Sequence, residues 1–175
     1  MKMSEKVYLQ LPAPTEEDFR SSAQRIKEGL QQTHGQVRVP VAVLRKLYPL
    51  CQKAQWKITA TLSLDGHDWV LVNVEAGDTT GQHYGLAVDL GSTTVDMEVV
   101  DLHSGQVLAS RTAVNRQVAY GNEILSRIFA GHENPQVQEQ LRQLTVETIQ
   151  KLVDGLSEEI SCDLTGCGMM VISGN

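Results

Sequence analysis

The sequence predicts an α/β protein made of two successive units, a small α+β unit over residues 1–82 and a strand-and-helix unit over residues 83–175. Residues 56–64 alternate between apolar and polar side chains, which is the period of a strand, and two stretches with helical spacing precede them. Residues 84–113 contain three further strand-like stretches separated only by tight turns, and helical stretches follow. Residues 76–82, rich in Gly, Asp and Thr, are typical of a linker.

The first unit is expected to begin with a short edge strand at residues 7–11, which Pro12 ends. A helix is expected next. Thr15 with Asp18 is the predicted capping pair at its N-terminus, and Gly35 ends it. The apolar residues at helical spacing within it are Phe19, Ala23, Ile26 and Leu30.

A second helix is expected to begin near Pro40, where the missing N–H costs nothing. The strand at residues 56–64 then turns at Asp65-Gly66, because glycine accepts the positive φ of a tight hairpin turn. Its return strand is expected over residues 67–75. Two helices and a hairpin of this size make a small α+β unit.

The second unit is expected to open with three antiparallel strands, near residues 84–90, 95–100 and 106–113. A short helix should follow, with Ile124, Leu125 and Ile128 facing inward. The helix after it is the longest, with Asn134 as its cap and Pro135 at its first position. The apolar residues 169–172 predict a last strand in the interior of a sheet.

Composition excludes several classes of protein. Hydrophobic residues make up 41% and charged residues 21% of the chain, which indicates a globular protein. The net charge of −6, with no basic cluster, gives no support to a nucleic-acid role. No apolar stretch reaches the roughly 20 residues of a membrane span, and the N-terminus lacks the apolar core of a signal peptide. The odd number of cysteines favours free thiols in a reduced, cytoplasmic protein.

The turn after the first strand of the second unit has the composition of a phosphate- and metal-binding cradle. Its candidate residues are Asp89, Gly91, Ser92, Thr93 and Thr94. The glycine lets the backbone come close to an anion, the N–H groups of the turn can point at it, and three hydroxyl groups add donors. The carboxylate of Asp89 would face Mg²⁺, held through waters. The alternative is an ordinary hairpin turn, since these are common turn residues.

Other charged residues nearby are interpreted as surface residues. Asp96 and Glu98 alternate outward on the next strand and are expected to be solvated rather than to bind metal. Arg127 and Glu123 are four residues apart on the short helix, a spacing typical of an exposed ion pair. The alternative is a role of this helix near the nucleotide or at a partner surface.

Two levels of resemblance follow from these motifs. The order strand, Asp-x-Gly-Ser-Thr-Thr turn, strand, turn, strand, helices and a strand ending in Gly174-Asn175 is similar to the first half of the ribonuclease-H-like fold of actin, sugar kinases and heat-shock chaperones. More narrowly, the chain resembles the reductive activators of corrinoid-dependent proteins. The segments that carry this resemblance are KVYLQLP (6–12), WKITATL (56–62), YGLAVDLGSTTV (84–95), GQVLA (105–109), NRQ (115–117) and AYGNEILSRI (119–128).

The resemblance implies an ATP-dependent electron donor. It makes residues 1–82 the linker and middle domain, and residues 83–175 the first subdomain of an actin-like ATPase domain. Asp89 would be the catalytic residue that organises Mg²⁺ and its waters, and Gly91 to Thr94 would hold the β- and γ-phosphates of ATP. The parent protein would carry an iron–sulfur cluster and would reduce the cobalt of its partner, a corrinoid protein, from +2 to +1. That reduction restores methyltransferase activity.

Two parts of this family are missing from the sequence, namely a four-cysteine iron–sulfur motif and a second phosphate loop. We therefore expect a fragment that is inactive alone and binds ATP weakly or not at all, and that could form a homodimer by covering its open sheet. One alternative is another ATPase of the same superfamily, such as a dehydratase activator or a sugar kinase. The other is a docking or dimerisation module without turnover.

Overall fold

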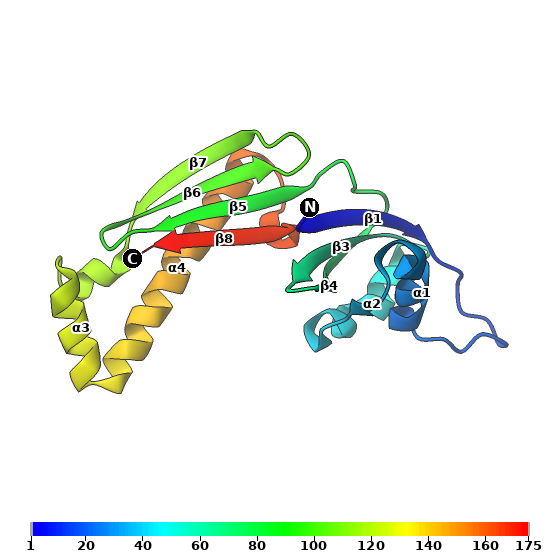
Figure 1. Cartoon of the computed structure of the whole chain (residues 1–175), viewed down its shortest axis with the longest axis horizontal. Helices are drawn as coiled ribbons and strands as arrows, with labels where there is room; N and C mark the ends of the chain where they lie inside the picture. Colours follow the sequence, from blue (N-terminus) through cyan, green and yellow to red (C-terminus); the bar gives the residue numbers. More distant parts are fainter. Residues whose placement is uncertain (1, 175) are drawn as a thin grey trace. The chain divides into compact units, whose positions relative to one another are not determined.

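The computed structural model describes residues 2–174 and divides into two compact units. One unit comprises the residues up to His83 together with Gly166–Met169, and the other comprises Tyr84–Thr165 together with the residues from Met170 on. Each unit is built on its own four-stranded sheet (Figure 1). This mixed α/β architecture with two sheets confirms the fold class that the sequence predicts.

The first unit has two helices on one face of a sheet with the strand order β1-β3-β4-β2 (Figure 1). Strand β1 is an edge strand, as expected, and it pairs antiparallel with β3, while β2 pairs parallel with β4. The elements are β1 (Ser4–Gln10), α1 (Ser22–His34), β2 (Val37–Arg38), α2 (Val41–Lys53), β3 (Lys57–Asp65) and β4 (Asp68–Ala76).

The core of this unit follows from the alternation along β3. Ile58 and Leu62 are fully buried within a cluster that includes side chains of both helices. Each such side chain contributes about 1.5–3 kcal/mol on burial. Thr59, on the opposite side of the strand, is buried as well. Its hydroxyl donates to the carbonyl of Gly77 at 2.7 Å and accepts from the amide of Thr79 at 2.9 Å. The predicted linker therefore lies on the second face of this sheet.

The start of α1 differs from the predicted capping pair. Ser21 is the N-cap, and its side chain accepts a backbone N–H, whereas Thr15 lies in a turn outside the helix. The carboxylate of Asp18 forms ion pairs with Arg20 at 2.6 Å and with the buried Arg25 at 2.7 Å. The capping prediction is wrong because Asp18 bonds to two charged donors, which are stronger partners than a single backbone N–H.

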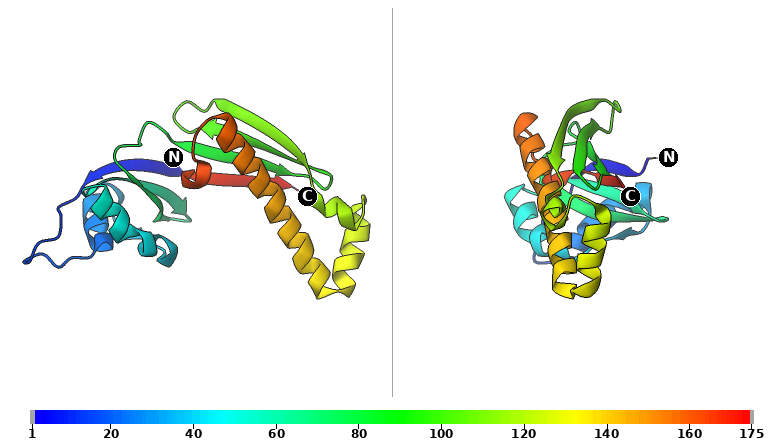
Figure 2. Two further views of the ribbon diagram at one scale, coloured as in Figure 1. Left: turned by 180° about the vertical axis from the view of Figure 1, so that it is seen from behind. Right: turned by 90° about the vertical axis from the view of Figure 1, so that its left-hand side faces the viewer.

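The second unit is a sheet with the order β7-β6-β5-β8 and helix α4 on one of its faces (Figures 1 and 2). Strands β5, β6 and β7 are antiparallel neighbours. β8 runs in the same direction as β5 (Figure 1), and its last residue, Gly174, lies beside Leu90, the last residue of β5. The elements are β5 (Tyr84–Leu90), β6 (Thr94–Asp101), β7 (Val107–Val114), the 3₁₀ helix η1 (Arg116–Tyr120), α3 (Ile124–Glu133), α4 (Pro135–Glu159), the 3₁₀ helix η2 (Leu164–Gly166) and β8 (Met169–Gly174).

Helix α4 packs on this sheet through its C-terminal half, where Leu152 and Leu156 are buried. The side chain of Arg111 on β7 lies against Gly155, where an added Cβ atom would be 2.1 Å from Nη1 of the arginine. The side chain of Arg111 crosses the helix here and donates from Nε to Glu159 at 2.9 Å. None of the helices described covers the opposite face of the sheet.

The apolar face of α3 points in the direction opposite to the one predicted. Ile124, Leu125 and Ile128 are 46%, 58% and 56% exposed, and the buried residue of this helix is Arg127. Helical spacing establishes which residues share a face, but it does not say whether that face meets the core. The prediction of inward-facing residues is therefore wrong.

Strand β8 also differs from its prediction. It lies at the edge of its sheet, and Met170, Val171 and Ile172 are each at least 40% exposed. The apolar sequence predicts a covered interior strand, yet no described element covers it on either side. Asn175, which completes the Gly-Asn ending, lies outside the described residues.

Across residues 2–174, every helix is too short or too polar to cross a membrane.

The ion pairs of Asp18 give the stability of the first unit a pH dependence. Hydrogen bonds from Arg20, and then from Arg25, hold the pKa of the Asp18 carboxyl well below its usual range. A depressed carboxyl pKa contributes stability above the unfolded pKa of about 4 and loses it as the pH falls toward the folded value. We expect Asp18→Asn to lower the free energy of unfolding at neutral pH, and the difference from wild type to shrink steadily below about pH 4.

Urea denaturation of both proteins across this pH range measures the difference. Asp68→Asn is a suitable control, because Asp68 is exposed at the start of β4 and forms no ion pair within residues 2–174. A difference between wild type and Asp18→Asn that stays constant with pH would contradict the assignment.

Candidate phosphate-binding turn

The candidate site is the turn that joins β5 to β6, at one end of the second sheet (Figure 1). The two strands are paired up to Leu90 and Val95, so the turn is as tight as the sequence predicts. Ser92, Thr93 and Thr94 are all exposed, and their hydroxyl groups are accessible from solvent.

Neighbouring groups hold three successive carbonyl oxygens of this turn. The side-chain amide of Asn115 donates to the carbonyl of Gly91 at 2.9 Å, and its backbone N–H donates to that of Thr93 at 2.8 Å. Between them, the guanidinium of Arg127 donates to the carbonyl of Ser92 at 2.5 Å. Asn115 and Arg127 are only 2% and 4% exposed. The turn is therefore fixed from behind by two buried polar side chains.

This arrangement determines where the amide groups of the turn point. In a trans peptide, the N–H lies opposite the C=O of the same unit. Because the carbonyls of Gly91 and Ser92 face their protein donors, the N–H groups of Ser92 and Thr93 face away from them. Neither N–H donates to any group within residues 2–174. Successive free N–H groups of this kind form a concave site that attracts anions.

Gly91 is needed for a steric reason. A Cβ atom at this position would lie 2.7 Å from the carbonyl oxygen of Thr94, a distance that side-chain carbons do not adopt. The turn closes on itself at this point, and only a residue without a side chain permits it.

Two carboxylates stand opposite each other beside the turn. Asp89 on β5 is the direct cross-strand partner of Asp96 on β6, and both are exposed. The hydroxyl of Thr112 donates to the carboxylate of Asp96. Like charges at directly opposite positions are unfavourable, and a bound cation would relieve the repulsion. Residues 2–174 hold no cluster of three or more metal-ligating side chains, so a cation here would take its other ligands from phosphate and water.

The structure corrects the interpretation of Arg127 as half of an exposed ion pair with Glu123. Its guanidinium also donates to the carbonyls of Gly121 at 2.8 Å and Asn122 at 3.3 Å, in addition to that of Ser92. A partial signal was present in the sequence, because Arg127 is the only charged residue between positions 124 and 131. For Asn115 the signal was its place in the NRQ segment (115–117) of the family resemblance, which assigns it no contact with the turn. Its role depends on the end of β7 reaching the turn.

Comparisons with known families agree over nearly the whole chain. The family profile described as RACo linker region matches residues 2–81, and the profile described as RACo middle region matches residues 84–175. The second match alone covers more than half of the chain. This chain belongs to the RACo family. The profile called middle region matches the second unit, residues 84–175. The interpretation of the sequence instead places the middle domain in the first unit, residues 1–82.

Individual relatives are similar over different extents. The solved structure described as the reductive activator for corrinoid, iron-sulfur protein is 30% identical with a TM-score of 0.73, over 99% of this chain and 28% of that one. The corrinoid activation enzyme RamQ of Eubacterium limosum is 29% identical over 92 residues, 53% of this chain and 16% of RamQ. This chain thus spans less than a third of either relative. The archaeal actin homolog Ta0583, 15% identical over 86% of this chain and 63% of its own, has a TM-score of 0.28, which is too low to support an inference.

The close approach at Gly91 can be tested by adding a single methyl group. We expect Gly91→Ala to lower the free energy of unfolding by about 1–3 kcal/mol, because the new Cβ atom forces the turn away from the carbonyl of Thr94. Gly81→Ala is the matched control, since a Cβ atom there would meet nothing within 4 Å. Urea denaturation compares the two, and equal stability of both variants would contradict this account of the turn.

Proposed function

We propose that this chain provides the linker region and the first phosphate-binding part of a cytoplasmic, ATP-dependent reductive activator of a corrinoid protein. The observation that carries the proposal is the turn itself. Its carbonyls are bonded to Asn115 and Arg127, and its free N–H groups and hydroxyls face solvent. The proposed partner is a corrinoid protein because this chain belongs to the RACo family and the relatives described above are corrinoid activators.

Each residue of the turn has a role in this proposal. The N–H groups of Ser92 and Thr93 bind phosphate oxygens of ATP, and the hydroxyls of Ser92, Thr93 and Thr94 add donors. Asp89 orients the water shell of Mg²⁺, and the cation offsets the repulsion between Asp89 and Asp96. Gly91 allows the backbone to come close to the phosphates.

The parent protein would carry an iron–sulfur cluster, which would supply the single electron that converts cobalt(II) to cobalt(I) in the corrinoid protein, and ATP hydrolysis would supply the driving force. This restores methyltransferase activity to the corrinoid protein. The three cysteines of this chain, Cys51, Cys162 and Cys167, are free thiols, one short of the four that hold such a cluster. The cluster is therefore assigned to another part of the parent.

A second candidate function is a docking or dimerisation module without turnover. It is favoured by the exposed apolar side chains of α3 and β8, which are the kind of surface that proteins use for association. The two candidates differ in whether the turn binds phosphate.

Asp89→Ala tests the first candidate in the parent protein. We expect ATP hydrolysis and the reduction of cobalt(II) to fall at least about 100-fold, because Mg²⁺ loses the carboxylate that orients it. Glu98→Ala is the control, since Glu98 is exposed two residues further along β6 from Asp96 and is expected to have no effect. Phosphate release and the absorbance of the corrinoid follow the two activities, and circular dichroism checks the fold.

Hydrolysis that is unchanged in Asp89→Ala would rule out the phosphate-binding assignment. For the isolated chain, titration calorimetry with Mg·ATP is expected to show weak binding or none, because the turn contacts one side of the nucleotide.

A further inference from the structure

Helix α3 is attached to its unit in an unusual way. Its apolar side chains face solvent, and among its described side chains only that of Arg127 is buried. Apolar packing therefore contributes little to its position. The hydrogen bonds of the Arg127 guanidinium, to the carbonyls of Ser92, Gly121 and Asn122, join the helix to the phosphate turn and to the segment before it.

The charge of Arg127 has no carboxylate partner among the residues described, because its acceptors are all neutral carbonyl oxygens. A buried guanidinium without a counter-charge is costly, and an anion close to it would lower that cost. The peptide between Ser92 and Thr93 lies directly against this charge. A phosphate bound by the N–H of Thr93 would be held across one peptide unit from the guanidinium.

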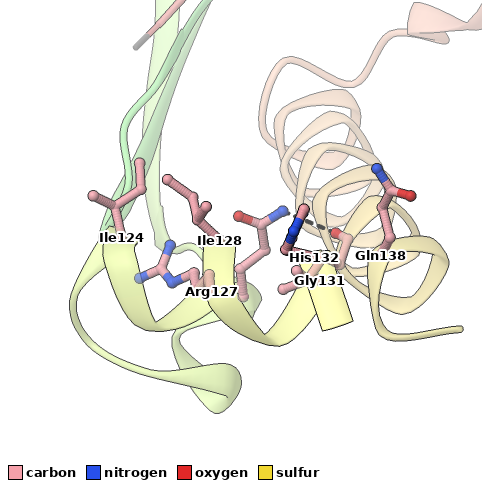
Figure 3. A pocket seen from close by; sticks show the side chains of 8 residues that line it. Ile124, Arg127, Ile128, Gly131, His132 and Gln138 are labelled. Carbon is pink, nitrogen blue, oxygen red and sulfur yellow. Dashed lines mark hydrogen bonds between the residues drawn. The ribbon is translucent and has the colours of Figure 1, made fainter. Parts of the chain in front are cut away.

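Arg127 also lines a pocket of about 440 Å³ between α3 and α4 (Figure 3). Ile124 and Ile128 lie on the same side of this pocket as Arg127, and Gln138 on α4 lies across from them (Figure 3). A shift of α3 relative to α4 would therefore move Arg127 and, through it, the carbonyl of Ser92.

We propose that Arg127 is a positioning residue for the phosphate turn, which sets the direction of the Ser92–Thr93 peptide and couples the position of α3 to phosphate binding. This inference rests on the proposed function of the turn. Arg127 itself does not contact the phosphate in this arrangement. It acts by holding a carbonyl so that the N–H on the other side of the same peptide stays directed outward.

The test uses this chain, labelled with ¹⁵N, and Mg²⁺ with tripolyphosphate as the probe, added to high concentration because amide signals report binding that is too weak for calorimetry to detect. In the wild type we expect the amide signals of Ser92 and Thr93, and the Nε–Hε signal of Arg127, to shift on titration. Arg127→Ala should weaken the affinity for tripolyphosphate about 10-fold, and Arg127→Lys should recover part of the loss because it keeps the charge and donates from a single nitrogen. Arg142→Ala is the matched control, because Arg142 is exposed and within residues 2–174 its ion pair is with Glu139 alone.

The outcomes separate this inference from the function on which it rests. If the wild type binds tripolyphosphate at the turn and Arg127→Ala binds it equally well, the role of Arg127 is wrong and the phosphate site stands. If the wild type shows no shift at the turn, the phosphate site and the inference both fail. If Arg127→Ala does not fold, the test rests on two other measurements. These are the affinity of Arg127→Lys for tripolyphosphate and the shift of the wild-type Nε–Hε signal of Arg127 on titration. Wild-type affinity in Arg127→Lys together with an unmoved Nε–Hε signal overturns the inference.

Discussion

Two buried side chains, Asn115 and Arg127, hold the turn after β5 through hydrogen bonds. These bonds determine where the elements around the turn must lie in the second unit. Asn115 uses both ends of its side-chain amide, since its nitrogen holds the carbonyl of Gly91 and its oxygen accepts the N–H of Gln117 at the start of η1. Arg127 holds the next carbonyl. Leaving such buried groups unpaired costs about 1–3 kcal/mol each, so the end of β7, the start of η1 and the first turn of α3 must all converge on this point.

The charges around the turn are arranged to suit a phosphate with its cation. A buried positive charge lies behind the turn at Arg127, and two opposed negative charges stand beside it at Asp89 and Asp96. Each arrangement is unfavourable alone, because one leaves a cation without a counter-charge and the other places like charges together. A phosphate on the turn and a cation near Asp89 would relieve both. This match between the charges of the turn and those of a phosphate with its cation is the physical basis of the proposed function.

The residues of the turn itself could be predicted from the sequence, whereas the distant residues that hold its carbonyls could not. Residues 89–94 are contiguous, so their turn composition and flanking strand periods could be recognised directly. Asn115 and Arg127 act at 24 and 35 residues from the carbonyls they hold, and no local pattern encodes such distances. The same limit explains the errors at α3 and β8. Their apolar residues are grouped as predicted, but which surface is covered depends on what packs against it, and periodicity carries no information about that.

The proposed phosphate site requires that the turn present its free N–H groups to phosphate while its carbonyls remain bonded to Asn115 and Arg127. A crystal structure of this chain grown with Mg²⁺ and tripolyphosphate tests it most directly. We expect phosphate oxygens within hydrogen-bonding distance of the N–H groups of Ser92 and Thr93, with the carbonyl of Ser92 still bonded to Arg127. A tripolyphosphate bound elsewhere, or a turn whose carbonyls have left Asn115 and Arg127 to face the ligand, would contradict it.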